Sequence, residues 1–203
     1  MSTLRTSVAF PIVISGPSGV GKTTVIERVV AADPLLRESV SVTTRPPRPG
    51  EVSGRDYFFV SRDVFEQMKT RELVEWADVH GEFYGTPRRF LEQELAGGSD
   101  VVLNVDIQGG DSVKRSFPGA VMVFILPPSH NILEQRMRLR GDASERDLEI
   151  RLRNAKNEIS GSINYDYIVV NDDLDRAVAT IQAIITAERC RRDRQKPVPD
   201  RAR

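Results

Sequence analysis

Residues 16–23 read Gly-Pro-Ser-Gly-Val-Gly-Lys-Thr, which satisfies the pattern G-x-x-x-x-G-K-[ST] at every specified position. Glycines let backbone N–H groups turn toward a phosphate, and the helix that follows directs its positive end at the same anion. In such a loop Lys22 can reach the β- and γ-phosphates, and the Thr23 hydroxyl can bind Mg²⁺. The motif predicts a nucleoside triphosphate site made of Gly16, Pro17, Ser18, Gly19, Val20, Gly21, Lys22, Thr23 and Thr24.

A second group of residues could hold another phosphate. Arg45 and Arg48 lie three residues apart in the proline-rich stretch 41–51. Because prolines stiffen the chain, both guanidinium groups can converge on one dianion at little entropic cost. Two planar, bidentate donors suit the phosphate of a nucleoside monophosphate. This pairing favours a kinase that transfers the γ-phosphoryl group to a second small molecule.

A switch GTPase is the competing interpretation. Residues 106–109 read Asp-Ile-Gln-Gly, the D-x-x-G pattern with which such switches sense the γ-phosphate. Those proteins also carry N-K-x-D for guanine, and this tetrapeptide does not occur in the sequence. The GTPase interpretation is therefore disfavoured, and the D-x-x-G pattern is not interpreted as a sensor of the γ-phosphate.

Alternating strand and helix patterns indicate how these residues are positioned. Apolar runs predict strands at 8–15, 101–106, 120–126 and 167–170, and helical spacing or capping predicts helices at 23–31, 61–70, 86–97, 130–140, 145–159 and 173–189. Such alternation predicts a mainly parallel sheet covered on both faces. The stretch 41–90, rich in proline, glycine and aromatic residues, interrupts the alternation and is predicted to be an inserted substrate lobe.

Composition excludes several classes of protein. The 203 residues contain 29 basic and 29 acidic side chains, which argues against a general nucleic-acid binder. One cysteine and two histidines leave no material for an internal disulfide and little for a zinc cluster. The longest apolar run, 120–126, is too short to span a bilayer, and 1–11 lacks a secretory signal core. We expect a cytoplasmic protein with neither nucleic-acid nor membrane partners.

An ordered series of motifs resembles the guanylate kinase family over residues 11 to about 188. The series is GPSGVGKT, S-x-TTR-x-PR-x-GE, RDYFF, VEWA, EFYGT, DIQG, R-x-x-x-RG and VNDDL. The resemblance implies a P-loop NTPase fold with a three-layer α/β core at 1–40, 91–132 and 156–203, a GMP-binding lobe at 41–90 and a helical lid at 133–155. It implies the partners ATP and GMP, the products ADP and GDP, Mg²⁺ as the cofactor, and activity toward dGMP as well.

The resemblance also implies a role for individual residues. It places Ser41, Glu75 and Thr86 at the guanine, with Asn104 and Asp106 on the same side, and Arg45, Arg48, Tyr57 and Tyr84 at the GMP phosphate. It assigns Arg140 and Arg151 to the ATP phosphates and the transition state, Arg136 to their support, and Asn171 to the adenine or lid region. The catalytic set is then Lys22, Arg48, Arg140 and Arg151, with Thr23 as the metal ligand.

Two positions depart from the family pattern, and two other functions remain open. Asn104 stands where the family usually has a carboxylate, and Phe83 replaces the first of two tyrosines. One alternative is a non-catalytic phosphopeptide-binding module, which the intact P-loop disfavours. The other is a P-loop kinase for a different small acceptor. Glu75 disfavours it, because a carboxylate offers two acceptors to the adjacent N–H donors of guanine, whereas adenine presents an acceptor at N1.

Overall fold

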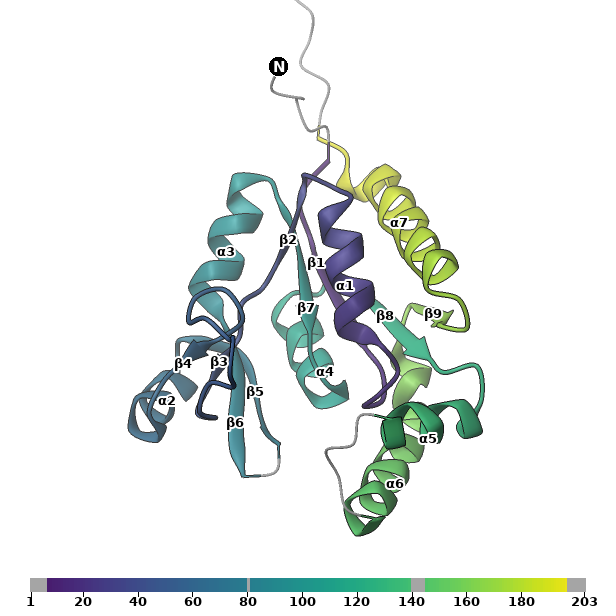
Figure 1. The fold of residues 1–203 in the computed structure, drawn as a ribbon. Helices are drawn as coiled ribbons and strands as arrows, with labels where there is room; N and C mark the ends of the chain where they lie inside the picture. Colours follow the sequence, from purple (N-terminus) through teal and green to yellow (C-terminus); the bar gives the residue numbers. More distant parts are fainter. Residues whose placement is uncertain (1–6, 80, 140–144, 197–203) are drawn as a thin grey trace, which may run out of the picture.

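The computed structural model describes residues 7–79, 81–139 and 145–196, and its centre is a five-stranded sheet (Figure 1). The strand order is β2 (Leu36–Glu38), β7 (Asp100–Asn104), β1 (Pro11–Ser15), β8 (Val121–Leu126) and β9 (Tyr167–Val170). Every neighbouring pair in this sheet is parallel. The predicted α/β class with a mainly parallel sheet is confirmed, with β2 as a short strand that the sequence patterns did not predict.

Helices cover both faces of this sheet, because successive residues of β1 are apolar and their side chains point alternately to one face and the other. Ile12 and Ile14 pack in one cluster with α1 (Lys22–Ala31) and α7 (Leu174–Cys190). Val13, between them, packs in a second cluster with α3 (Arg88–Gly97) and α4 (Ile107–Ser116). Burying both faces of β1 places the loop that follows it at the carboxyl end of the sheet, where ligands bind in such folds.

The stretch predicted to be a substrate lobe forms a second sheet of its own. Its strand order is β4 (Phe58–Phe59), β3 (Val42–Thr43), β6 (Glu82–Pro87) and β5 (Leu73–Val79), with α2 (Arg62–Lys69) packed against it. A separate small cluster of apolar side chains holds this sheet and α2 together, comprising Val42, Phe65, Leu73 and Phe83. The helix predicted from residue 86 begins instead at Arg88, because Thr86 and Pro87 end β6.

The remaining helices lie on the opposite side of the P-loop from the second sheet (Figure 1). They are α5 (His130–Leu139) and α6 (Glu145–Gly161), with a 3₁₀ turn at Ser162–Asn164 after α6; a second 3₁₀ turn, Arg192–Arg194, follows α7. The predicted lid, 133–155, therefore spans parts of α5 and α6 and the residues 140–144, which lie outside the described part. No helix in the described part is long and apolar enough to cross a membrane.

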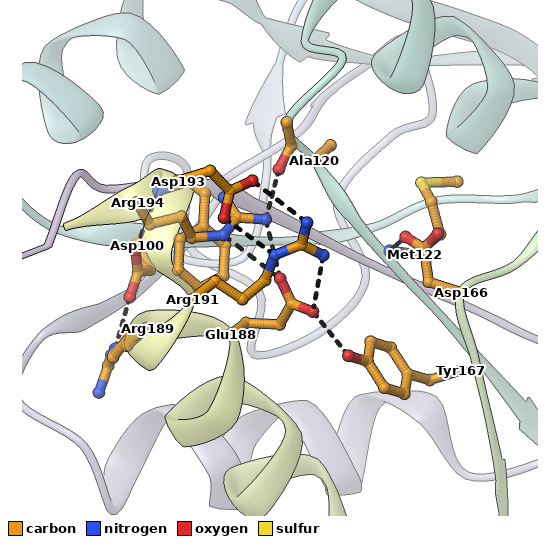
Figure 2. A network of polar contacts seen from close by, with 12 residues as sticks. Asp100, Ala120, Met122, Asp166, Tyr167, Glu188, Arg189, Arg191, Asp193 and Arg194 are labelled. Carbon is orange, nitrogen blue, oxygen red and sulfur yellow. Dashed lines mark hydrogen bonds and ion pairs between the residues drawn. The ribbon is translucent and has the colours of Figure 1, made fainter.

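Charged side chains after residue 187 tie the end of the chain to the core (Figure 2). Glu188 is buried and accepts hydrogen bonds from the Tyr167 hydroxyl at 2.6 Å and from Arg194 at 2.9 Å. The guanidinium of Arg194 also lies 4.0 Å from the centre of the Phe10 ring. Arg189 pairs with the buried Asp100 at 2.8 Å, so Arg189 and Arg194 are both held by buried acidic side chains, whereas residues 191–193 are exposed.

Candidate active site

A cleft of about 590 Å³ lies between the P-loop, the second sheet and α6. The central sheet contributes residues at the carboxyl ends of β2 and β7, and α5 contributes one side chain. The predicted site residues that line the cleft are Pro17, Ser18, Gly19, Gly21, Lys22, Thr23, Thr24, Ser41, Tyr57, Glu75, Tyr84, Asn104, Asp106 and Arg136. Residues more than a hundred positions apart in the sequence thus meet in one cavity.

The P-loop has the backbone that phosphate binding needs. Gly21 has a φ of 98°, in the left-handed region that glycine adopts without strain, and it caps the N-terminus of α1. Glycine has no side chain with which to cap the helix, so the first N–H groups of α1 are left for an anion. The Lys22 ammonium donates to the carbonyl oxygens of Gly16 and Pro17. It therefore lies over the loop that would hold the phosphates.

Two side chains support the loop from behind. The Asn171 side-chain amide donates to the carbonyl oxygen of Val20 at 2.8 Å. Arg136 donates to the same oxygen at 3.3 Å and to the Asn171 carbonyl at 3.1 Å. Asn171 is buried and belongs to the support of the P-loop in this structure, whereas Arg136 also faces the cleft.

A buried carboxylate marks the other end of the cleft. Glu75 on β5 is 7% exposed, and its Oε1 accepts a hydrogen bond of 2.6 Å from the Thr86 hydroxyl. Burial raises the pKa of Glu75 to about 7, with a further rise from the nearby charge of Asp106 and an opposing effect of the Thr86 hydrogen bond. Asp106 caps α4, where its Oδ1 accepts from the Gly109 N–H at 2.7 Å.

The predicted phosphate-binding residues form a cluster on the second sheet. Arg45 donates from Nε to the Tyr84 hydroxyl at 3.2 Å and pairs with Glu51 at 2.8 Å. Its guanidinium lies 5.4 Å from the centre of the Tyr57 ring. The side chain of Arg48 is exposed, and its backbone N–H donates to Glu51 at 2.6 Å. Glu51 thus binds both arginines and holds residues 45–51, the arginine loop, in a bent conformation.

Not all of the predicted residues reach the cleft. Among the described residues, those that do not line it are Gly16, Val20, Arg45, Arg48, Thr86, Arg151 and Asn171. Arg140 lies outside the described residues. Arg151 is half-buried on α6. The hydroxyl proton of Thr86 is used by Glu75, so in this structure Thr86 orients the carboxylate from below the cleft surface.

Other residues line the cleft although no role was predicted for them: Glu38, Ser39, Val79, Val105 and Glu158 lie outside the quoted motifs, and Asp56, Ala77 and Gly85 lie within them. Glu158 is the one with a charge close to the P-loop. Burial raises its pKa, the positive charge of Lys22 lowers it, and Asp106 raises it. Glu158 lies seven residues after Arg151, two turns along the same helix face, so helical spacing could have identified it.

The donor set of the cleft fits a magnesium ion held jointly with a nucleotide. The Thr23 hydroxyl, one residue from Lys22, faces the cleft. Within the described ranges, no three or more His, Cys, Asp and Glu side chains gather in a way that could hold a metal by themselves. Mg²⁺ commonly keeps several waters and takes phosphate oxygens with one or two protein oxygens, so one P-loop hydroxyl suits it.

A P-loop that faces a separate lobe with a buried carboxylate and an arginine–tyrosine cluster defines a phosphotransferase with a phosphorylated acceptor. Comparison with known proteins gives the family. The family described as Guanylate kinase matches residues 9–188. The chain belongs to the guanylate kinase family, as the sequence motifs predicted.

Individual relatives agree over nearly the whole chain. The guanylate kinase of Caldanaerobacter subterraneus subsp. tengcongensis is 48% identical over 186 residues, which are 91% of this chain and 90% of the relative. The guanylate kinase of Symbiobacterium thermophilum is 48% identical over 181 residues, 89% of this chain and 86% of the relative. The crystal structure of guanylate kinase from Anaplasma phagocytophilum superimposes with a TM-score of 0.78 at 36% identity, covering 93% of this chain and 90% of that one.

Proposed function

We propose that this protein is an ATP:GMP phosphotransferase, which transfers the γ-phosphoryl group of ATP to GMP and releases ADP and GDP. The observation that carries the proposal is one cleft with a P-loop at one end and the buried Glu75 carboxylate at the other. Family membership supports the same reaction. We expect dGMP to be accepted as well.

The ATP half of the proposal uses the P-loop. Backbone N–H groups of residues 16–24 would bind the phosphate oxygens, and Lys22 would leave the Gly16 and Pro17 carbonyls to contact the β- and γ-phosphates. Thr23 would hold Mg²⁺, which when bound adds positive charge that neutralises the phosphates. Arg136 and Asn171 keep the Val20 carbonyl fixed and thereby the shape of the loop.

The GMP half uses the second sheet and α4. Guanine presents two adjacent donors, N1–H and the N2 amino group, and the Glu75 carboxylate offers two acceptors. The Thr86 hydroxyl holds Oε1 of Glu75 and so fixes the orientation of the carboxylate. Ser41 and Asp106 line the same part of the cleft. Arg45, Arg48, Tyr57 and Tyr84 would bind the phosphate once the arginine loop turns toward the cleft.

Phosphoryl transfer requires alignment and positive charge rather than covalent participation of the protein. Lys22, Arg48, Arg140 and Arg151 would supply that charge around the moving group. Closure of the lid at 133–155 and of the GMP lobe at 41–90 over the core would bring Arg151 and Arg48 to the phosphates. It would also exclude water, which otherwise competes with GMP for the γ-phosphoryl group.

A coupled ADP-release assay with GMP, dGMP, AMP, CMP and UMP tests the proposal. A base site of buried polar groups rejects a mismatched edge strongly, so GMP should exceed AMP in kcat/KM by on the order of 10³ or more. Comparable turnover of AMP, or none with GMP, would refute it. A cytoplasmic location and the lack of nucleic-acid and membrane partners stay predictions from the sequence.

A further inference from the structure

The D-x-x-G pattern at residues 106–109 lies at the base end of the cleft. Asp106 is the N-cap of α4, and Gly109 is a buried residue in the first turn of that helix. Glycine in a helix interior costs about 1 kcal/mol relative to alanine, so a glycine at this place calls for a reason outside the helix.

Gly109 stands directly against the Glu75 carboxylate. A Cβ atom at residue 109 would lie 2.8 Å from Oε2 of Glu75, closer than real Cβ contacts allow, 3.0 Å from the Cβ of Val105 and 3.2 Å from Oδ1 of Asp106. The two carboxylate oxygens therefore lie within about 6 Å of each other, with the bare Cα face of Gly109 between them. Only a residue without a side chain leaves both oxygens where they are.

Glu75 has little freedom to avoid such a Cβ. Its other carboxylate oxygen, Oε1, is bound by the Thr86 hydroxyl at 2.6 Å, and the side chain is 93% buried. A rotation that moved Oε2 away from residue 109 would break that buried hydrogen bond. The backbone N–H of Gly109 meanwhile holds Oδ1 of Asp106 at 2.7 Å. One residue thus contacts both carboxylates, one by its N–H and one by its missing side chain.

We propose that Gly109 is a positioning residue for base selection, which sets where the Glu75 carboxylate meets the N1–H and N2 donors of guanine. The proposal rests on the proposed function. In this chain the D-x-x-G segment would then read the acceptor's base through two carboxylates, and not the γ-phosphate of a bound triphosphate. Any residue larger than glycine at 109 would displace Oε2 and weaken GMP while leaving the ATP side intact.

The neighbouring glycine has a different surrounding, which separates this role from simple helix packing. A Cβ at Gly110 would lie 2.6 Å from the Tyr165 hydroxyl and 3.1 Å from the Met122 side chain, both in the core. Gly110 therefore serves packing of α4 on the sheet, whereas the nearest atom to a Cβ at residue 109 belongs to the Glu75 carboxylate, ahead of the Val105 side chain. At Gly97, in the last turn of α3, a Cβ would meet nothing within 4 Å. Gly97→Ala is a matched control.

The test is a double-mutant cycle of Gly109→Ala with Glu75→Asp, read as KM and kcat for GMP, KM for ATP and thermal melting. The Glu75→Asp side chain is one methylene shorter and would no longer reach residue 109. Losing one hydrogen bond to a charged group typically corresponds to a tenfold change or more, so Gly109→Ala should raise KM for GMP at least about 10-fold. In the Glu75→Asp background the same change should have an effect of less than about 3-fold.

In Gly109→Ala, KM for ATP and the melting temperature should stay near those of the unchanged enzyme, as both should in Gly97→Ala. Equal effects of Gly109→Ala in both backgrounds would overturn the proposal, since Gly109 would then not act through Glu75. A parallel loss of ATP affinity or melting temperature would overturn it in favour of a packing role. If the unchanged protein does not phosphorylate GMP, the proposed function fails, and this inference with it.

Discussion

The raised pKa of Glu75 makes GMP recognition sensitive to pH near neutrality. Burial disfavours the charged carboxylate and moves the pKa from its ordinary 4.5 to about 7. The nearby charge of Asp106, the N-cap of α4, raises the pKa further, while the hydrogen bond from the Thr86 hydroxyl on β6 lowers it. Guanine donates at both N1 and N2 and therefore needs the ionised carboxylate. Because Glu75 would be about 90% ionised at pH 8 and about 10% at pH 6, kcat/KM for GMP should fall about 10-fold between them.

The same shift has a consequence for stability that runs in the opposite direction. The native chain holds the Glu75 proton more tightly than the unfolded chain, so stability is lost as the pH rises from 4.5 to about 7. At pH 8 the loss is on the order of 3 kcal/mol, since each pKa unit corresponds to about 1.4 kcal/mol. Glu75→Gln removes the charge and keeps an acceptor for Thr86. At pH 8 this variant should melt several degrees higher than the unchanged protein. At pH 5 the two proteins should melt at about the same temperature.

Initial rates of ADP release at saturating ATP, from pH 5.5 to 8.5, measure the kinetic effect. The GMP phosphate titrates near pH 6 as well and affects both enzymes equally. The informative quantity is therefore the rate of the unchanged enzyme divided by the rate of Glu75→Gln, because only the titration of Glu75 changes this ratio. That ratio should rise with pH and level off above about pH 8. A flat ratio, or a Glu75→Gln variant that gains no melting temperature at pH 8 relative to pH 5, would refute the reasoning.

Three further predictions concern the P-loop, the lid and the end of the chain. Lys22→Ala should lower kcat at least about 100-fold with an unchanged melting curve, because it removes a cation from the phosphates; near-normal turnover would contradict the P-loop assignment. Arg151→Ala should depress kcat much more than it raises KM for ATP, whereas an unchanged kcat with weaker ATP binding would make it a ground-state ligand. Arg194→Ala leaves the buried Glu188 with fewer donors and should lower the melting temperature by several degrees with kcat and KM unaltered; no change in melting would show that Tyr167 and Arg191 suffice.

The predicted parts of the molecule are those that short sequence patterns determine. Apolar runs predicted β1, β7, β8 and β9, because buried parallel strands carry apolar residues on both faces. None of the strands of the second sheet was predicted, and for β3 and β4 the reason is that each is two residues long and pairs with partners far along the chain. Pairing at that distance leaves no local period to detect. Thr86 and Pro87 resembled a helix start, although the pairing of Pro87 with Leu73 on β5 extends β6 through both residues.

Within the site, motif positions were predictable and the partners of each side chain were not. Glu75 could be placed at guanine by its motif, but its pKa depends on burial, on Thr86 and on Asp106, which only the packing of β5, β6 and α4 brings together. Glu158 illustrates the converse, since no motif contains it and yet α6 carries it into the cleft.

Glu158 also bears on the one unusual residue of the site. Asn104 provides an uncharged amide at the end of β7, and the carboxylates that line the same cleft are those of Glu38, Asp56, Glu75, Asp106 and Glu158, of which only Glu158 lies on α6. The Glu158 charge interacts with both Lys22 and Asp106. A carboxylate on α6 moves with that helix, whereas one at position 104 would be fixed to the sheet. The part of the negative charge that Glu158 contributes near Lys22 is therefore linked to the position of α6, and closure of the lid would change the electrostatic field at the phosphates as well as the access of water.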